Sequence, residues 1–78
     1  MTMLDLYVIP GCPYCKVVTD YMDEAGIEYR ELNIHTDPEA KQHLVDIGGK
    51  AQCPCLFIDG EPMYESRDIL DYLQSLID

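Results

Sequence analysis

Gly11-Cys12-Pro13-Tyr14-Cys15 directly follows an apolar run and directly precedes a helical pattern. This position places the first thiol where a strand becomes a helix, and the second thiol one turn further along that helix. Pro13 suits the first helical position, because proline has no N–H to leave unpaired and its φ is already helical. Cys12 is therefore expected at or beside the N-cap, where free backbone N–H groups and the helix dipole lower the thiol pKa from about 8.5.

The two thiols of this motif are expected to differ in accessibility. Cys15 should point back along the helix toward the protein, which leaves Cys12 as the exposed nucleophile and Cys15 as its resolving partner. Thiol–disulfide exchange needs this asymmetry. The alternative is a structural disulfide, but so short a ring restrains the unfolded chain little, because stabilisation by loop closure grows with loop length. We therefore interpret the pair as catalytic.

Composition and charge restrict the class of protein. The sequence has 78 residues, 47% hydrophobic and 26% charged, as in an ordinary soluble domain, and we expect a single domain over residues 1–78. A formal net charge of -10 argues against a nucleic-acid partner, because few cations are available to neutralise phosphates. The apolar run 6–9 is too short to be a membrane span or an export signal. We expect a cytoplasmic protein with no membrane partner, in which a Cys-x-x-Cys pair is more often redox-active than structural.

Hydrophobic periodicity and turn residues predict alternating strands and helices. The expected segments are a strand over 3–9, a helix over 13–25, a strand over 27–34, a helix over 36–47, a hairpin of strands 56–58 and 61–64, and a helix from 66 onward. The hairpin turns on Asp59-Gly60, and Pro62 indicates an edge strand. Short βαβ connections predict an α/β fold with a mixed four-stranded sheet and helices on both faces, although the pattern leaves the strand order open.

The same patterns predict where the helices begin and end. Gly26 suits the position after the first helix. Thr36 and Glu39 have the spacing of a capping box, and Ser66 is a good N-cap for the last helix. The apolar side chains expected to face inward are Val17, Val18, Tyr21, Met22 and Ala25 on the first helix, Ala40, Leu44 and Ile47 on the second, and Ile69, Tyr72, Leu73, Leu76 and Ile77 on the third.

Three motifs together resemble the glutaredoxin family. They are Cys12-Pro13-Tyr14-Cys15 after the first strand, Gln52-Cys53-Pro54 before the hairpin, and Met63-Tyr64-Glu65-Ser66-Arg67-Asp68 at the start of the last helix. Residues 48–73 also resemble the glutathione-binding domain of glutathione transferases, but a transferase needs an additional all-helical domain for its second substrate. The glutaredoxin resemblance implies the thioredoxin fold, βαβαββα with strand order 2-1-3-4 and three flanking helices, and a cis peptide bond before Pro54.

This resemblance implies a glutathione-dependent thiol–disulfide oxidoreductase. Cys12 would attack a disulfide or a glutathione mixed disulfide and take the glutathionyl group, which a second glutathione would remove. Cys15 could instead close a Cys12–Cys15 disulfide. Glutathione is expected as a co-substrate, with no tightly bound cofactor and no metal. The expected partners are glutathionylated or disulfide-containing proteins, and the chain is expected to be a monomer.

The residues that the resemblance assigns to glutathione binding are Tyr14, Lys41, Gln52, Cys53, Pro54, Glu65 and Ser66. The Cys53 backbone would pair with the cysteinyl part of glutathione like a short added strand. The γ-glutamyl carboxylate would lie at the start of the last helix near Ser66, which is equally a plain helix cap, and Glu65 would meet the α-ammonium group. Lys41 would meet the glycine carboxylate, and a solvated surface lysine is an equally good interpretation of this residue.

One position departs from the family pattern. Many glutaredoxins carry a lysine three residues before the first cysteine, where this chain has Ile9. We therefore expect Cys12 to be less acidic, and glutathione to be held more weakly, than in those relatives. Lys16 could partly replace the missing charge. The cations that flank the expected site segments, and would focus an anionic ligand in this acidic chain, are Lys16, Lys41, Lys50 and Arg67.

Cys53 and Cys55 are additions to the family pattern. Because the Pro54 loop should face Cys12, we hypothesise that Cys53 and Cys55 are secondary redox thiols. The alternative is that they are small buried hydrophobes.

Two other functions remain open at this point. Zinc is disfavoured, because 37 residues separate Cys15 from Cys53. An iron–sulfur cluster carrier, formed as a glutathione-ligated dimer through Cys12, is a stronger alternative that Pro13 disfavours by family analogy. A thioredoxin-like electron donor served by a reductase is the other alternative.

Overall fold

The computed structural model describes residues 3–77, and at residue 77 it describes the backbone alone. The elements along the chain are β1 (Leu4–Val8), α1 (Pro13–Ala25), β2 (Arg30–Asn33), α2 (Pro38–His43), the π-helical turn η1 (Leu44–Gly48), β3 (Cys55–Ile58), β4 (Glu61–Met63) and α3 (Ser66–Ile77). The strands form one sheet in the order β2-β1-β3-β4. β1 pairs in parallel with β2, and the β1–β3 and β3–β4 pairs are antiparallel, so the predicted mixed sheet and its strand order are confirmed.

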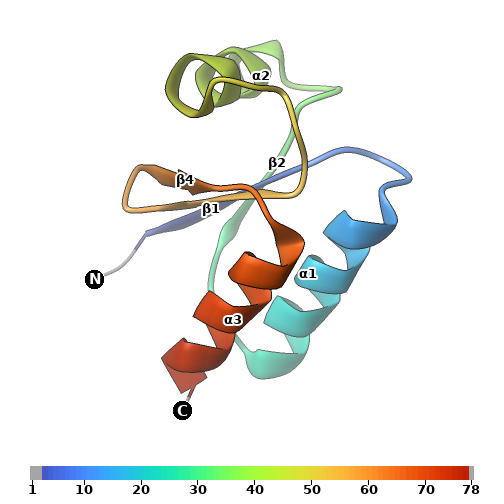
Figure 1. Ribbon diagram of the computed structural model, residues 1–78. Coiled ribbons are helices and arrows are strands. Elements are labelled where there is room, and N and C mark those ends of the chain that lie inside the picture. The colour runs from blue at the N-terminus through green and yellow to red at the C-terminus, as the bar shows by residue number, and fades with distance from the viewer. Residues whose placement is uncertain (1–2, 78) are drawn as a thin grey trace.

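The sheet separates two apolar cores because neighbouring residues of a strand point to opposite faces. On one face, Leu6 of β1 and Leu56 of β3 pack with the buried side chains of α1 and α3. On the other face, Tyr7 and Phe57 pack with Leu44 at the end of α2. Figure 1 shows the same layers, with α1 and α3 side by side on one face of the sheet and α2 on the other. The prediction of helices on both faces is therefore confirmed.

The start of α1 follows the sequence closely. Cys12 is the N-cap in an extended conformation, and Pro13 is the first helical residue. Gly26 ends the helix with φ 69°, in the left-handed region that favours glycine. The hairpin is also as predicted: Asp59 and Gly60 both have positive φ, as a two-residue turn of the type I′ class requires, and Pro62 lies on the edge strand β4.

The starts of α2 and α3 differ from the prediction by one residue each. Asp37, not Thr36, caps α2, because its Oδ1 accepts the N–H groups of Glu39 and Ala40 at 3.1 Å each. Pro38 occupies the first helical position and thereby fixes the cap at the residue before it. At α3 the Glu65 carbonyl accepts the N–H of residue 69 at 2.9 Å, so Ser66 lies inside the helix rather than at its N-cap.

Some side chains expected to face inward do not. Val17, Ile47 and Leu76 are 51%, 53% and 45% exposed, whereas Val18, Met22 and Leu44 are fully buried. Ile47 turns outward because the second helix widens into η1, and a π-helical turn breaks the 3.6-residue spacing on which the prediction rested. The expected strand over 27–34 pairs with β1 only over Arg30–Asn33. The Ile77 side chain lies outside the described residues.

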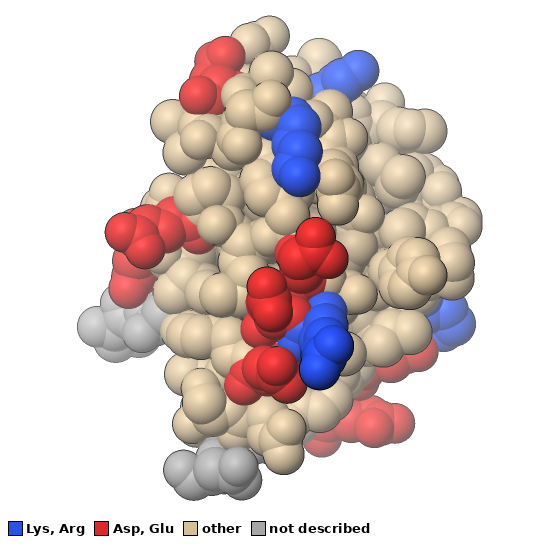
Figure 2. All heavy atoms as spheres, viewed as in Figure 1, with Lys and Arg blue, Asp and Glu red and all other residues tan. Residues whose placement is uncertain are grey.

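The helices within residues 3–77 include none that is both long and apolar enough to cross a membrane. Acidic side chains are prominent on the face shown in Figure 2, where several surround a basic one over the region of α3.

Candidate active site

The start of α1 gives Cys12 an environment that stabilises its thiolate. The thiol is half-buried, and its Sγ accepts a hydrogen bond from the Cys15 N–H at 3.4 Å. Burial alone would raise the pKa of Cys12, but hydrogen bonds from the Cys15 thiol and from the backbone N–H groups of Cys15 and Tyr14 outweigh it and hold the pKa below its ordinary value. A thiolate is therefore more readily formed here than in a free cysteine.

Cys15 has the opposite character. It is 4% exposed and packs into the core between α1, α3 and the sheet. Burial raises the pKa of the Cys15 thiol to about 12, and the nearby Cys12 and Cys53 thiols add to the rise. The helix thus separates an accessible, acidic sulfur from a protonated one that a local movement must expose before it can react.

The segment before β3 lies against the same sulfur. The Cys12 thiol donates to the Cys53 carbonyl at 3.9 Å, and the Cys53–Pro54 peptide bond is cis. The cis bond was implied by the family resemblance, and the structure has it. Cys53 is half-buried and Cys55 fully buried, and burial raises the pKa of each thiol to about 11.

A groove of about 260 Å³ opens beside this segment. Its lining residues are Tyr14, Gln52, Cys53, Pro54, Tyr64, Glu65 and Ser66. Six of the seven residues that the sequence assigned to glutathione binding therefore meet at one groove, from α1, the loop before β3 and the start of α3. Lys41 is not among them; it lies exposed on α2.

Tyr64 is the groove residue to which the sequence analysis gave no role. Its hydroxyl donates to the Lys50 carbonyl at 2.8 Å, and the Lys50 Nζ lies 4.7 Å from the centre of its ring. A Cβ atom at Gly48 would lie 2.8 Å from the Tyr64 Cζ, so the absence of a side chain there allows this ring position. The sequence could have indicated a role for Tyr64 in the groove, because this residue lies inside the Met63–Asp68 motif. The Lys50 ammonium therefore lies over a ring that lines the groove, although Lys50 itself does not line it.

A second cavity, of about 180 Å³, differs from the groove in that the reactive thiol itself lines it. Cys12 and Cys15 both line it, together with Lys16 and Glu31. The Lys16 Nζ lies 3.1 Å from Asp20 Oδ2 in an exposed ion pair. Its charge is therefore shared with Asp20 and is a weak substitute for a lysine at position 9.

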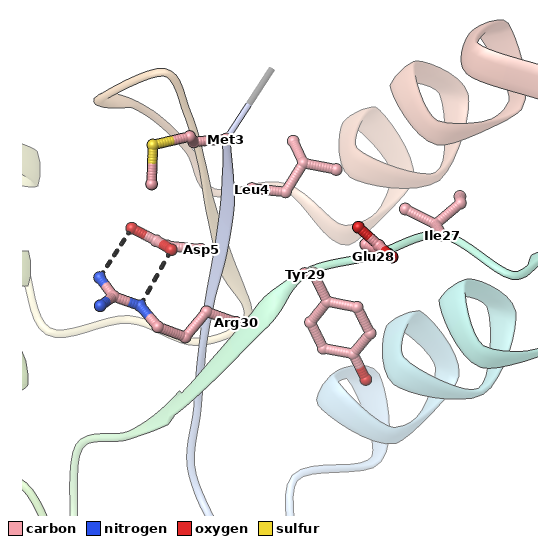
Figure 3. Close-up of a pocket in the computed structure, with 7 residues that line it drawn as sticks. All are labelled: Met3, Leu4, Asp5, Ile27, Glu28, Tyr29 and Arg30. Atoms are coloured by element: carbon pink, nitrogen blue, oxygen red, sulfur yellow. Dashed lines mark hydrogen bonds and ion pairs between the residues drawn. The ribbon is translucent and has the colours of Figure 1, made fainter. Parts of the chain in front are cut away.

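The largest cavity, about 550 Å³, is remote from the thiols and is shown in Figure 3. It lies between the start of β1 and the segment that enters β2, and two hydrogen bonds of 3.1 and 3.2 Å join Arg30 to Asp5 at its wall. Its lining residues are Met3, Leu4, Asp5, Ile27, Glu28, Tyr29 and Arg30, which include no cysteine. Size therefore does not identify the reactive site in this molecule, and thiol chemistry does.

The arrangement at Cys12 determines what the site can do. A stabilised thiolate beside a buried thiol can attack a disulfide and then be resolved by its neighbour. Among residues 3–77, no three or more His, Cys, Asp and Glu side chains are grouped so that they could hold a metal ion. With its strand order and cis proline, the chain falls in the class of thiol–disulfide redox proteins with the thioredoxin fold.

Comparison with known proteins narrows this class. The glutaredoxin family model matches residues 4–63, which is most of the chain, so the chain belongs to the glutaredoxin family. Glutaredoxin 3 of Escherichia coli is 25% identical over 61 residues, covering 78% of this chain and 74% of that protein.

Solved structures agree with this fold. The thioredoxin-like protein BC3987 superimposes with a TM-score of 0.82 at 26% identity, over 94% of this chain and 97% of its own. Buckwheat glutaredoxin, solved as a complex with glutathione, has a TM-score of 0.76 over 97% of this chain and 72% of its own. At 18% identity, the buckwheat protein supports the fold alone.

Proposed function

We propose that this protein is a glutathione-dependent thiol–disulfide oxidoreductase that reduces glutathione mixed disulfides and other disulfides of proteins and small molecules. The observation that carries the proposal is the Cys53–Pro54 segment, which contacts the Cys12 sulfur at 3.9 Å and also lines the 260 Å³ groove. A ligand in this groove would therefore have its own sulfur beside Cys12. Membership of the glutaredoxin family supports the choice of ligand.

The reaction begins at Cys12. Its thiolate attacks one sulfur of the substrate disulfide, a new S–S bond forms to Cys12, and the other sulfur leaves as a thiolate that takes up a proton. With a glutathione mixed disulfide, Cys12 takes the glutathionyl group and the substrate thiol is released reduced. The thiolate of a second glutathione then attacks the glutathionyl sulfur, which releases glutathione disulfide and regenerates Cys12. Cys15 provides the alternative route by attacking the Cys12 sulfur and forming a Cys12–Cys15 disulfide.

The groove offers partners for each end of glutathione. The backbone of Cys53 would pair with the cysteinyl part. The first turn of α3, with Ser66 at its first position, offers free N–H groups to the γ-glutamyl carboxylate, and Glu65 would meet the α-ammonium. For the glycine carboxylate we favour Lys50 over Lys41, because Lys50 stacks on a ring that lines the groove.

The test is glutathione-dependent reduction of a small mixed disulfide by the wild type, Cys12→Ser and Cys15→Ser. We expect Cys12→Ser to lose all activity, because Cys12 has a lowered pKa, whereas burial raises the pKa of the other three thiols. Cys15→Ser should keep activity if the one-thiol route dominates. A wild type that reduces disulfides with a reductase, but not with glutathione, would contradict glutathione dependence and favour the thioredoxin-like donor. Activity in Cys12→Ser would contradict the assignment of the nucleophile.

A further inference from the structure

A third thiol lies beside the reactive pair. The Cys12 thiol contacts the carbonyl oxygen of Cys53, and that carbonyl is bonded to the Cα atom that carries the Cys53 side chain. Cys12 and Cys53 also pack against one apolar cluster, which contains Cys15.

Cys53 differs from Cys15 in its accessibility. Cys15 is only 4% exposed, whereas Cys53 is half-buried and lines the groove in which a substrate bonded to Cys12 would lie. Burial raises the pKa of both thiols, to about 12 for Cys15 and to about 11 for Cys53. Both thiols are therefore mostly protonated near neutral pH, and the difference that favours Cys53 is its access to the groove.

We propose that Cys53 is an alternative resolving thiol, which attacks the mixed disulfide on Cys12 and forms a Cys12–Cys53 disulfide. The inference rests on the proposed function, because substrate disulfides supply the oxidising equivalents. The Cys53 thiol gives up its proton, its sulfur bonds to the Cys12 sulfur, and the bond from Cys12 to the substrate sulfur breaks. The departing thiolate takes up a proton. Two glutathione molecules then reduce the Cys12–Cys53 disulfide and leave as glutathione disulfide.

Cys55 provides the matched control. It is two residues away from Cys53 and has a similar pKa of about 11, but it is fully buried in the cluster on the α2 face of the sheet, with Tyr7 and Phe57. The proposal therefore assigns resolution to Cys53 and none to Cys55. Replacing each cysteine separately distinguishes a positional effect from a loss of thiols in general.

The experiment traps the first intermediate. Cys15→Ser, Cys15→Ser/Cys53→Ser and Cys15→Ser/Cys55→Ala are treated with glutathione disulfide, quenched with acid, and analysed by intact mass after alkylation of free thiols. Trypsin cleavage after Lys16, Lys50 and Arg67 gives peptides 1–16 and 51–67. A Cys12–Cys53 disulfide joins these two peptides, whereas a Cys12–Cys15 disulfide in the wild type is internal to peptide 1–16.

We expect Cys15→Ser and Cys15→Ser/Cys55→Ala to lose the glutathione adduct and give the joined peptides, and Cys15→Ser/Cys53→Ser to keep the adduct. An adduct that persists equally in Cys15→Ser and in Cys15→Ser/Cys53→Ser would overturn the role of Cys53 while leaving the proposed function intact. Absence of an adduct from Cys15→Ser/Cys53→Ser, with its fold verified by circular dichroism, would instead overturn the chemistry assigned to Cys12. Peptide mapping of the oxidised wild type is a second measurement. If peptides 1–16 and 51–67 are joined neither in the wild type nor in Cys15→Ser, the inference is also overturned.

Discussion

The start of α1 and the segment before β3 each carry two cysteines, but only α1 lowers the pKa of one of them. At α1, hydrogen-bond donors converge on the Cys12 sulfur and hold its pKa below the ordinary value. In the other segment burial dominates, and the pKa values of Cys53 and Cys55 rise to about 11. Backbone hydrogen bonds also reach Cys15 and Cys55, but burial outweighs them there. Reactivity therefore depends on whether the hydrogen bonds to a sulfur outweigh its burial.

The two regions nevertheless depend on each other. The α1 region supplies the nucleophile, and the loop before β3 supplies a carbonyl against it and much of the adjacent groove. β1 and β3 are neighbours in the sheet, with Tyr7 opposite Cys55, so the residues that follow β1 and precede β3 meet at one edge. The topology therefore brings together two segments that lie about forty residues apart in the sequence.

The largest expected effect tests the difference in pKa directly. In a brief treatment of the reduced protein with iodoacetamide near neutral pH, we expect Cys12 to be alkylated on the order of a hundredfold faster than Cys53 or Cys55, because only thiolates react and a thiol with a pKa near 11 is almost wholly protonated there. Fragmentation of peptides 1–16 and 51–67 identifies the modified sulfur.

The control is the same treatment in urea, where all four thiols should react at similar rates. Equal alkylation rates for Cys12 and Cys53 in the folded protein would contradict the difference in pKa between these two thiols. A rate for Cys12 that follows pH with an ordinary cysteine pKa would contradict the stabilisation of its thiolate by α1.

The pH dependence of the free energy of unfolding provides the next test, because Cys55 and Cys12 should contribute to it with opposite signs. A thiol whose pKa rises on folding keeps its proton in the folded chain while the unfolded chain loses it, so the free energy of unfolding falls as pH rises from about 8.5 toward about 11. Cys55→Ala removes this contribution and should make that fall shallower. Cys12 has a lowered pKa, so its contribution is present above the unfolded pKa and is lost as pH falls through the folded pKa.

Urea unfolding of the wild type, Cys55→Ala and Cys12→Ser at a series of pH values measures both effects. Tyrosines with raised pKa values are common to all three proteins and largely cancel in the differences. Parallel curves for the wild type and Cys55→Ala would show that burial does not perturb the Cys55 thiol. A Cys12→Ser curve that departs from the wild type in the same sense as Cys55→Ala would contradict the opposite signs.

Much of the fold was predictable because each element carried local signals that agreed. Pro13 after Cys12 identified the start of α1, and Asp59-Gly60 identified the hairpin turn. The errors arose where several residues could serve one role. Threonine and aspartate both suit an N-cap position, and Pro38 selects Asp37 over Thr36 because proline occupies the first helical position. Ile47 was misplaced because nothing local indicates that the helix widens into η1.

The groove was predictable from motifs, but the position of Lys50 beside Tyr64 was not. The residues at positions 52–54 and 65–66 lie at fixed places relative to the strand and helix that they precede, so family spacing is informative for them. A lysine on a helix is different, because its direction depends on the rotation of the whole helix about its axis. Lys41 lies on α2, which packs on the opposite face of the sheet from α1, whereas Lys50 follows η1 and reaches Tyr64. That contact exists only in the folded chain.

The smallest expected effect distinguishes these two lysines. Lys50→Met should raise the KM for glutathione about twofold to fivefold with little change in kcat, because one partly exposed charge pair contributes roughly 0.5–1 kcal/mol. Lys41→Met is the matched control and should leave KM nearly unchanged, because Lys41 is exposed on α2, whereas Lys50 stacks on Tyr64, a residue that lines the groove. Steady-state kinetics at varied glutathione and at low and high salt measures the effect, which salt should weaken. A larger effect for Lys41→Met would show that glutathione extends over α2, and the groove beside Cys53 would then hold only part of the ligand.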